Sequence, residues 1–375
     1  MARYKYFDKS QGLFLTVCLD EQLIPGSFEH TLNYLIDQFD LSAFNAAFRN
    51  DQLGAPAYPP DVMLKIIFYC YSRGIITSRP IEYACKTNII VKALARDAEP
   101  DHDTIAHFIS SQAEAVKGLF AQVLLTCYAL GLIGGELFAI DGCKLPSNAA
   151  KEWSGTLEEL GKKKKDLEAL MEKIIAQHVQ FDKQAGEERD LTGAAYSYVY
   201  DKEYQKKHLE RIEKKLKYID HFLETAEARE GAAGEEVKSN ITDNGSAKIK
   251  GAHGYIQGYN GIAVADSKNQ VTVAAETFGT GSEHFPVMLE SLNENMKTLT
   301  GNDRPLEEAI VEGDTGYFTE KNLKEAKERK KIDRPEYRVL YGRRMQIIEP
   351  CFSDMSYCKG MDRFLLRTKI KVNIQ

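Results

Sequence analysis

The stretch Leu137-Phe138-Ala139-Ile140-Asp141-Gly142 decides the fold, because a run of four apolar residues meets a single acid there. Ala309-Ile310-Val311-Glu312-Gly313-Asp314 follows the same pattern, so both predict buried strands that end in an aspartate, Asp141 and Asp314. Met345-Gln346-Ile347-Ile348-Glu349-Pro350 predicts the start of a helix that carries Glu349. Mg²⁺ binds hard oxygen ligands on rigid elements, so the three acids predict a metal site and phosphoryl-transfer chemistry.

The composition is typical of a soluble globular protein with more than one domain, since 43% of the 375 residues are hydrophobic and 28% are charged. The net charge of −6 is unevenly distributed. Residues 315–375 hold 15 Lys and Arg against 8 Asp and Glu, or +7, which leaves −13 on the rest. The basic residues are therefore concentrated around Glu349, and a uniformly cationic nucleic-acid coat is excluded.

Cysteine usage and hydropathy indicate a protein of the reducing cytoplasm. The 7 cysteines form no C-x-x-C pair and lie mostly in apolar runs, so we expect reduced, buried thiols and no zinc site. The N-terminus lacks the apolar core of a signal peptide. Gln122, Gly134-Gly135 and Glu136 divide the apolar stretch 119–140, which predicts a buried helix running into a core strand and no membrane span.

The first 134 residues have helical patterns with short connectors. Pro59-Pro60-Asp61 predicts a helix start and Arg73-Gly74 its end, while Thr77-Ser78-Arg79-Pro80 and Asp101-His102-Asp103-Thr104 predict the caps of two further helices. Short helices joined by tight polar turns are compatible with a DNA-binding helix-turn-helix array. They are also compatible with a bundle that has no DNA role.

Residues 155–230 are rich in charge, and two apolar stripes predict antiparallel helices linked between 181 and 200. The basic run 162–165 then faces solvent, with phosphate contact as the alternative. One stripe comprises Leu209, Ile212, Leu216, Ile219 and Leu223, and the other Leu160, Leu167, Met171, Ile174 and His178.

After Gly234 the pattern becomes strand-like. Residues 262–265 and 271–275 predict a hairpin closed by the turn 266–269, followed by a helix over 282–292, a strand over 309–313 and a helix over 319–330. This order predicts an α/β domain, a mixed sheet with helices on its faces, into which the helical hairpin is inserted. Asp266 is a rival metal ligand, although its sequel favours a plain turn.

The three acids allow two interpretations. Held together, they would bind two metal ions about 4 Å apart, which activate an attacking oxygen and stabilise the leaving oxygen of a phosphodiester. Alternatively, each Asp after an apolar strand merely caps the following turn.

The chain resembles the DDE transposases of bacterial insertion sequences, most closely the insertion sequence family eleven-eighty-two. The resemblance runs over nearly the whole length. Its motifs are Tyr58-Pro59-Pro60, Ser78-Arg79-Pro80-Ile81-Glu82, Ile140-Asp141-Gly142-Cys143-Lys144, His253-Gly254, Gly258-Tyr259-Asn260-Gly261, Asp314-Thr315-Gly316-Tyr317-Phe318 and Glu349-Pro350-Cys351-Phe352.

This resemblance implies a ribonuclease H-like core whose first, second and third acids are Asp141, Asp314 and Glu349. It also implies Mg²⁺ or Mn²⁺, probably as two ions, double-stranded DNA with terminal inverted repeats, target DNA, a homodimer on DNA and a nucleoid-associated place in the cytoplasm. We expect DNA contacts from Arg79, Lys144, Tyr341, Arg343, Arg344 and Lys359.

The expected organisation has three parts. Residues 1–134 form a helical DNA-binding domain, 135–154 with 235–375 form the ribonuclease H-like catalytic domain, and 155–234 form the helical hairpin insertion.

Some spacings depart from the family pattern. Glu349 follows Arg344 by five positions, Ser356 stands where relatives carry Lys, and only 35 positions separate Asp314 from Glu349. The sequence also stops at Gln375, where relatives continue into an apolar helix. A second hypothesis is therefore a shortened, inactive remnant that still binds DNA.

Other residues allow further alternatives. Asp314-Thr315-Gly316 matches an aspartic-protease signature, but such enzymes need two aspartates and the chain has one copy. His102, His253 and His284 are either extra ligands or ordinary turn and surface histidines. Trp153 either stacks on a base or packs within the protein.

Overall fold

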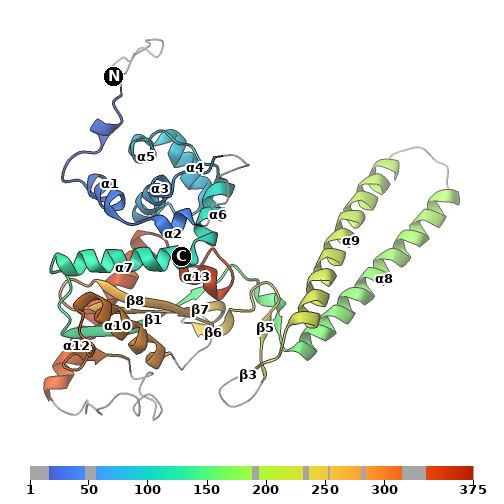
Figure 1. Cartoon of the computed structure of the whole chain (residues 1–375). Helices are drawn as coiled ribbons and strands as arrows, with labels where there is room; N and C mark the ends of the chain where they lie inside the picture. Colours follow the sequence, from blue (N-terminus) through green and yellow to red (C-terminus); the bar gives the residue numbers. More distant parts are fainter. Residues whose placement is uncertain are drawn as a thin grey trace, which may run out of the picture. The chain divides into compact units, whose positions relative to one another are not determined.

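The computed structural model describes residues 17–46, 56–187, 194–230, 236–251, 254–279, 284–314 and 335–374. The chain forms two compact units (Figure 1). One is Met1–Val123 with Cys358–Met361, and the other is Leu124–Tyr357 with Asp362–Gln375.

The first unit is helical in its described residues. A 3-10 turn, η1 (Asp20–Gln22), precedes α1 (Phe28–Gln38), α2 (Ser42–Asn45), α3 (Pro60–Ser72), α4 (Ser78–Thr87), α5 (Ile89–Leu94) and α6 (His102–Ser111). Helix α7 (Ala113–Ala129) begins here and ends in the second unit. Helix α3 is the centre of the apolar core, since all but one of its residues from Val62 to Cys70 are buried.

The predicted helix boundaries of this unit are confirmed. Pro60 is the first residue of α3, where its missing N–H costs nothing, and Gly74 follows the helix with φ 74°. Asp101 caps α6, because its carboxylate accepts a hydrogen bond from the Thr104 N–H at 2.7 Å. Thr77 precedes α4 as predicted, but its side chain makes no capping hydrogen bond.

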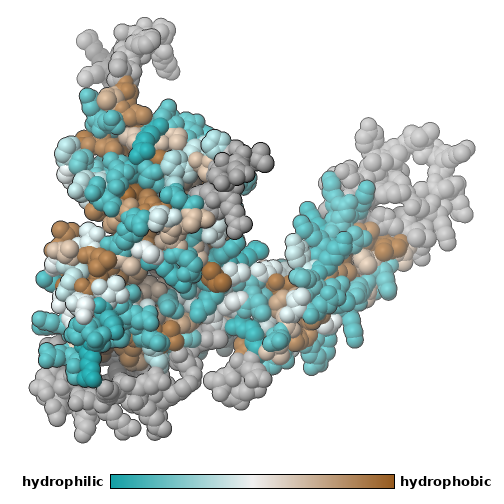
Figure 2. Space-filling model, viewed as in Figure 1, coloured by the Kyte–Doolittle hydropathy of each residue, from teal (hydrophilic) through white to brown (hydrophobic). Residues whose placement is uncertain are grey.

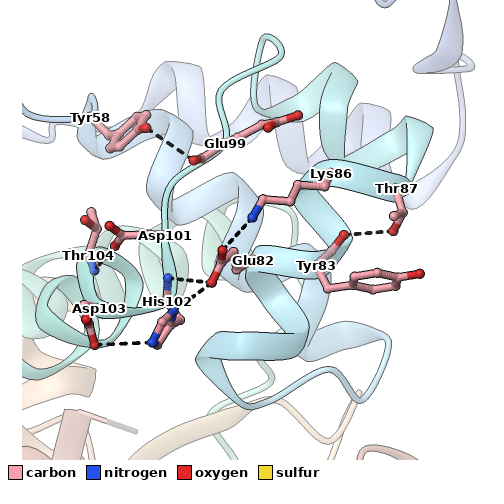
Figure 3. A network of polar contacts seen from close by, with 10 residues as sticks. All are labelled: Tyr58, Glu82, Tyr83, Lys86, Thr87, Glu99, Asp101, His102, Asp103 and Thr104. Atoms are coloured by element: carbon pink, nitrogen blue, oxygen red, sulfur yellow. Dashed lines mark hydrogen bonds and ion pairs between the residues drawn. The ribbon is translucent and has the colours of Figure 1, made fainter.

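Glu82 joins α4 to α6 (Figure 3). Its carboxylate accepts hydrogen bonds from Lys86 Nζ at 2.6 Å and from the His102 N–H at 3.1 Å, and it contacts His102 Nδ1 at 2.8 Å. The bonds from Lys86 and His102 lower the pKa of Glu82 to about 2. His102 therefore serves helix packing, which agrees with its interpretation as a turn histidine.

The second unit contains a mixed five-stranded sheet. Its strands are β1 (Leu137–Pro146), β6 (Ala247–Gly251), β7 (Gly254–Asp266), β8 (Thr272–Phe278) and β9 (Ile310–Glu312). Strand β7 pairs antiparallel with β1, β6 and β8, while β9 runs parallel to β1. The predicted mixed sheet is thus present, with β1 between β7 and β9. Helix α7 followed by β1 also matches the predicted helix and core strand.

Asp266 closes the β7–β8 hairpin at the predicted turn. It is fully buried, and its carboxylate accepts hydrogen bonds from the N–H groups of Gly134 at 3.0 Å, Gly135 at 2.9 Å and Lys268 at 2.9 Å. Both carboxylate oxygens are therefore used to fix the backbone on either side of the hairpin.

Two helices cover the sheet. Helix α10 (Phe285–Thr300) packs against β7 and β8, and it ends at Gly301, which has φ 69°. It lies where a helix over 282–292 is expected, but it continues for eight residues more because Met296 and Leu299 are also buried. Helix α12 (Pro335–Ser353) packs against β1, β7 and β9, with Ile347 and Ile348 on Ala139, Ala263 and Ala265.

The predicted helical hairpin is present as α8 (Leu157–Glu187) and α9 (Ala194–Thr225). Ile174, Ile212 and Leu216 form the seam, and Lys164 Nζ bonds Asp220 Oδ1 across it at 2.6 Å. Leu223 is only half-buried, and Phe222 occupies the buried position instead. Figure 2 shows hydrophilic residues over most of the outer surface of both helices.

Two short strand pairs lie beside this hairpin in sequence. They are β2 (Ser154–Gly155) with β5 (Ser239–Asn240), and β3 (Arg229–Glu230) with β4 (Glu236–Val237). No helix in the described part of the chain is long and apolar enough to cross a membrane.

The C-terminal segment packs on the sheet through α13 (Lys369–Ile374). Val372 is buried with Leu145, Tyr259 and Phe364, and Asn373 Oδ1 accepts a hydrogen bond from the Thr277 N–H at 2.8 Å. A buried carboxylate oxygen, Asp243 Oδ1, bonds both the Tyr259 hydroxyl at 2.6 Å and the Thr368 N–H at 3.0 Å. This segment therefore closes one end of the apolar core.

Candidate active site on the sheet face beneath α12

Asp141 lies in the middle of β1, so the prediction that the strand ends there is wrong. Residues 142–146 continue the antiparallel pairing with β7, which extends the strand to Pro146. On its other side β1 pairs with β9 only from Leu137 to Ala139. Asp141 thus sits just past the end of the neighbouring parallel strand.

Asp314 follows the end of β9 at the corresponding level. The last pair between the strands is Ala139 with Glu312, and Asp141 and Asp314 each lie two residues farther on. Side chains alternate along a strand, so both aspartates belong to the face that carries Ala139. Ala139 packs on α12, as does Ala263, the register partner of Asp141. The first two predicted acids therefore fall on one face of the sheet, and both are half-buried.

Arg344 of α12 contacts this face directly. Its Nη1 donates to Asp141 Oδ2 at 2.7 Å, and the residue is 8% exposed. Arg344 is spaced three and four residues from Ile347 and Ile348, which places all three on the buried stripe of the helix. The predicted DNA-binding Arg344 is thus, in this structure, the counter-ion of the first predicted acid.

Glu312 is a fourth acid on the same face, and the sequence reasoning missed it. It is 8% exposed, and burial raises its pKa, while the guanidinium groups of Arg344 and Arg343 act in the opposite direction. Its position two residues before Asp314 is the sequence signal that could have identified it, because strand residues two apart share a face.

Glu349 lies elsewhere on α12. It is exposed, and it follows Arg344 by five residues, which corresponds to about 140° around the helix axis. In the part of the chain that the structure describes, no group of three His, Cys, Asp or Glu residues is arranged to hold a metal ion. The convergence of Asp141, Asp314 and Glu349 therefore stays a prediction.

Pro350 fixes the local structure around Glu349. A proline has no N–H, so the Gln346 carbonyl one turn earlier loses its usual helical partner. The side chain of Gln270, in the β7–β8 turn, supplies a replacement through an Nε2 hydrogen bond to the Gln346 oxygen at 3.1 Å. The thiol of Cys351 in turn donates to the Gln270 carbonyl at 3.5 Å.

An open depression of about 570 Å³ lies beside Asp141. It is lined by Gly142, Cys143, Lys144, Lys250, Gly251 and Phe352. Lys144 Nζ donates to the Lys250 carbonyl at 3.0 Å, which holds two lysines at one rim. Burial, with a smaller effect of Asp141, raises the pKa of the Cys143 thiol, so this thiol is not activated as a nucleophile. Cationic and aromatic side chains together suit a nucleic-acid strand better than a small apolar ligand.

The remaining predicted DNA contacts are spread over the chain. Arg343 is exposed on α12, and Arg79 is exposed on α4. Lys359 is half-buried and belongs to the first unit. The backbone of Tyr341 is helical, but its side chain lies outside the described residues.

Other residues singled out from the sequence have structural partners. Lys215 Nζ lies 5.1 Å from the centre of the Trp153 ring, and His284 stacks on Phe278. His253 and the helix expected over 319–330 lie outside the described residues, as do the two residues that follow Asp314 in the protease-like signature.

Comparison with known proteins identifies a class for the N-terminal helices. Residues 17–111, which span η1 to α6, match the family described as transposase domain (DUF772). No curated protein and no solved structure matches the chain. The chain therefore carries a transposase-type domain, and this match supports a transposase.

Proposed function

We propose that this protein is a DNA transposase that cleaves and joins strands at the terminal inverted repeats of an insertion sequence. The observation that carries the proposal is the placement of Asp141 and Asp314 at one level of adjacent parallel strands, on the face beneath α12. The transposase-type domain at residues 17–111 gives independent support. The chemistry would be metal-dependent phosphodiester hydrolysis followed by transesterification.

A ribonuclease H-like core is part of this proposal. Strands β8, β7 and β1 form an antiparallel meander, β9 adds a parallel strand beside β1, and helices pack on the sheet. Such a sheet is compatible with that core and holds the first two acids on rigid elements.

The donor groups fit a divalent cation. Carboxylate oxygens are the ligands that Mg²⁺ and Mn²⁺ prefer, and Asp141 already binds a cationic group at 2.7 Å. Asp141 and Asp314 would hold the ions, with Glu349 as the proposed third acid. When bound, two such ions would neutralise the charge that develops on the attacking and leaving oxygens of the phosphodiester.

The lysines beside the acids would orient the DNA. Lys144 and Lys250 at the depression, with the exposed Arg343, would bind phosphate oxygens on either side of the reacting one. We propose that the N-terminal unit binds the duplex through residues that include Arg79, and that Tyr341 and Lys359 also contact DNA. A homodimer, which would bring two element ends together, and a nucleoid-associated location in the cytoplasm complete the proposal.

Strand cleavage of a labelled duplex that carries the element's own terminal DNA tests the assignment. Asp141→Asn, Asp314→Asn and Glu349→Gln should each abolish Mg²⁺-dependent cleavage and leave gel-shift binding intact. Glu308→Gln, at an exposed acid just before β9, is the matched control and should cleave normally. Cleavage retained by Asp141→Asn or Asp314→Asn would refute the assignment.

A remnant that binds DNA without cutting it is the second candidate. The exposed position of Glu349, away from the buried stripe of α12, favours this alternative. It predicts a gel shift that weakens steeply with salt and no cleavage at any Mg²⁺ or Mn²⁺ concentration.

A further inference from the structure

Two carboxylates and one guanidinium share the sheet face beneath α12. Arg344 is bonded to Asp141 at 2.7 Å, and Glu312 is close enough for Arg344 to lower its pKa. Glu312 Oε2 is buried and has no hydrogen-bond partner among the described residues. Glu312 and Arg344 are each 8% exposed, so both charges lie away from water.

This arrangement limits what happens when a cation binds Asp141. An arginine stays charged at all ordinary pH values, and a buried charge that loses its partner is strongly destabilising. A divalent cation on Asp141 competes with Arg344 for the same carboxylate. The guanidinium then needs another anion on this face, and Glu312 offers a buried carboxylate oxygen.

We propose that Arg344 is an exchangeable counter-ion, which neutralises Asp141 in the metal-free protein and moves to Glu312 when a divalent cation binds Asp141. This inference rests on the proposed function, since it takes Asp141 as a metal ligand. Glu312 is then a positioning residue that acts through Arg344, and the metal affinity depends on both side chains.

Mn²⁺ binding to the full chain without DNA, followed by electron paramagnetic resonance, tests the exchange. Arg344→Gln removes the competing cation, so Mn²⁺ should bind about tenfold more tightly than to the wild type. Glu312→Gln removes the acceptor of the guanidinium, so the affinity should fall by a similar factor. In the Arg344→Gln background, Glu312→Gln should have no further effect.

The control is Arg304→Gln, which removes an exposed guanidinium from the loop before β9 and should leave the affinity unchanged. An unchanged or weaker affinity in Arg344→Gln would overturn the exchange. An equal loss from Glu312→Gln in both backgrounds would also overturn it and make Glu312 a direct ligand. Mn²⁺ binding that survives Asp141→Asn refutes the proposed metal site itself, and no binding in any variant refutes both.

Thermal unfolding without metal gives a second test that keeps Arg344 in place. Asp141→Asn leaves Glu312 to pair with the guanidinium, and Glu312→Gln leaves Asp141. The double variant leaves neither carboxylate, so its fall in Tm should exceed the sum of the two single falls. Additive falls would overturn the exchange even if Arg344→Gln fails to fold.

Discussion

Replacing Asp266 by alanine should destabilise the sheet unit strongly without any role for a metal. The carboxylate is fully buried and accepts three backbone hydrogen bonds, from Gly134, Gly135 and Lys268 at 2.9–3.0 Å. A hydrogen bond to a charged group contributes about 1.5–3 kcal/mol, and bonds to one carboxylate are not additive. We therefore expect Asp266→Ala to lower the free energy of unfolding by roughly 4 kcal/mol.

Urea unfolding followed by the fluorescence of Trp153, the single tryptophan, reports on this unit. Lys268→Ala is the control, because it changes an exposed side chain and keeps the backbone N–H that Asp266 binds. A loss of less than about 1 kcal/mol in Asp266→Ala would refute the reasoning, since that is the contribution of one ordinary hydrogen bond. Loss of Mn²⁺ binding at unchanged stability would instead make Asp266 a metal ligand.

Three further predictions concern other parts of the chain. Gly258→Ala should destabilise by about 3 kcal/mol or more, because its Cβ would lie 2.1 Å from the Leu145 carbonyl oxygen, whereas Gly261→Ala meets its nearest atom at 3.7 Å and should unfold in urea like the wild type. The lowered pKa of Glu82, about 2, stabilises the fold above the carboxyl's ordinary pKa of 4.5, and this contribution is lost as the pH falls towards 2. The Tm of the wild type should therefore fall more steeply over that range than the Tm of Glu82→Gln, and parallel curves would contradict this. Asp37→Ala should destabilise more than Lys65→Met in thermal melts, because only the former leaves the buried ammonium with Asp61 at 3.9 Å as its nearest printed carboxylate; equal losses would contradict the prediction.

Local chemistry accounts for the parts of the fold that the sequence predicted well. Pro60 and Gly74 set the ends of α3, Asp101 caps α6, and the turn at Asp266 closes the β7–β8 hairpin. Each depends on one residue type whose backbone or side-chain preference acts within a few positions. The seam of α8 and α9 was also predictable, because a spacing of three and four fixes one helix face.

Long-range pairing accounts for the parts that the sequence did not predict. Strand β1 continues past Asp141 because residues 258–262 of β7 lie opposite it, and no local pattern states this. The ion pair between Asp141 and Arg344 joins residues about 200 positions apart. Glu312 becomes a site residue only when β9 is placed beside β1 with α12 over both.

Helix geometry links the exposed Glu349 to the proposed chemistry. Arg344 and Glu349 point about 140° apart on a regular helix, so they do not both face Asp141 while α12 stays regular. The helix already lacks the hydrogen bond that Pro350 cannot donate, and Gln270 holds the vacant Gln346 carbonyl. The residues after Gln346 can therefore change direction at the cost of about one hydrogen bond, roughly 1 kcal/mol, while Arg344 stays over the sheet. Loss of cleavage in Glu349→Gln would thus require this half of α12 to change its direction when DNA and metal bind.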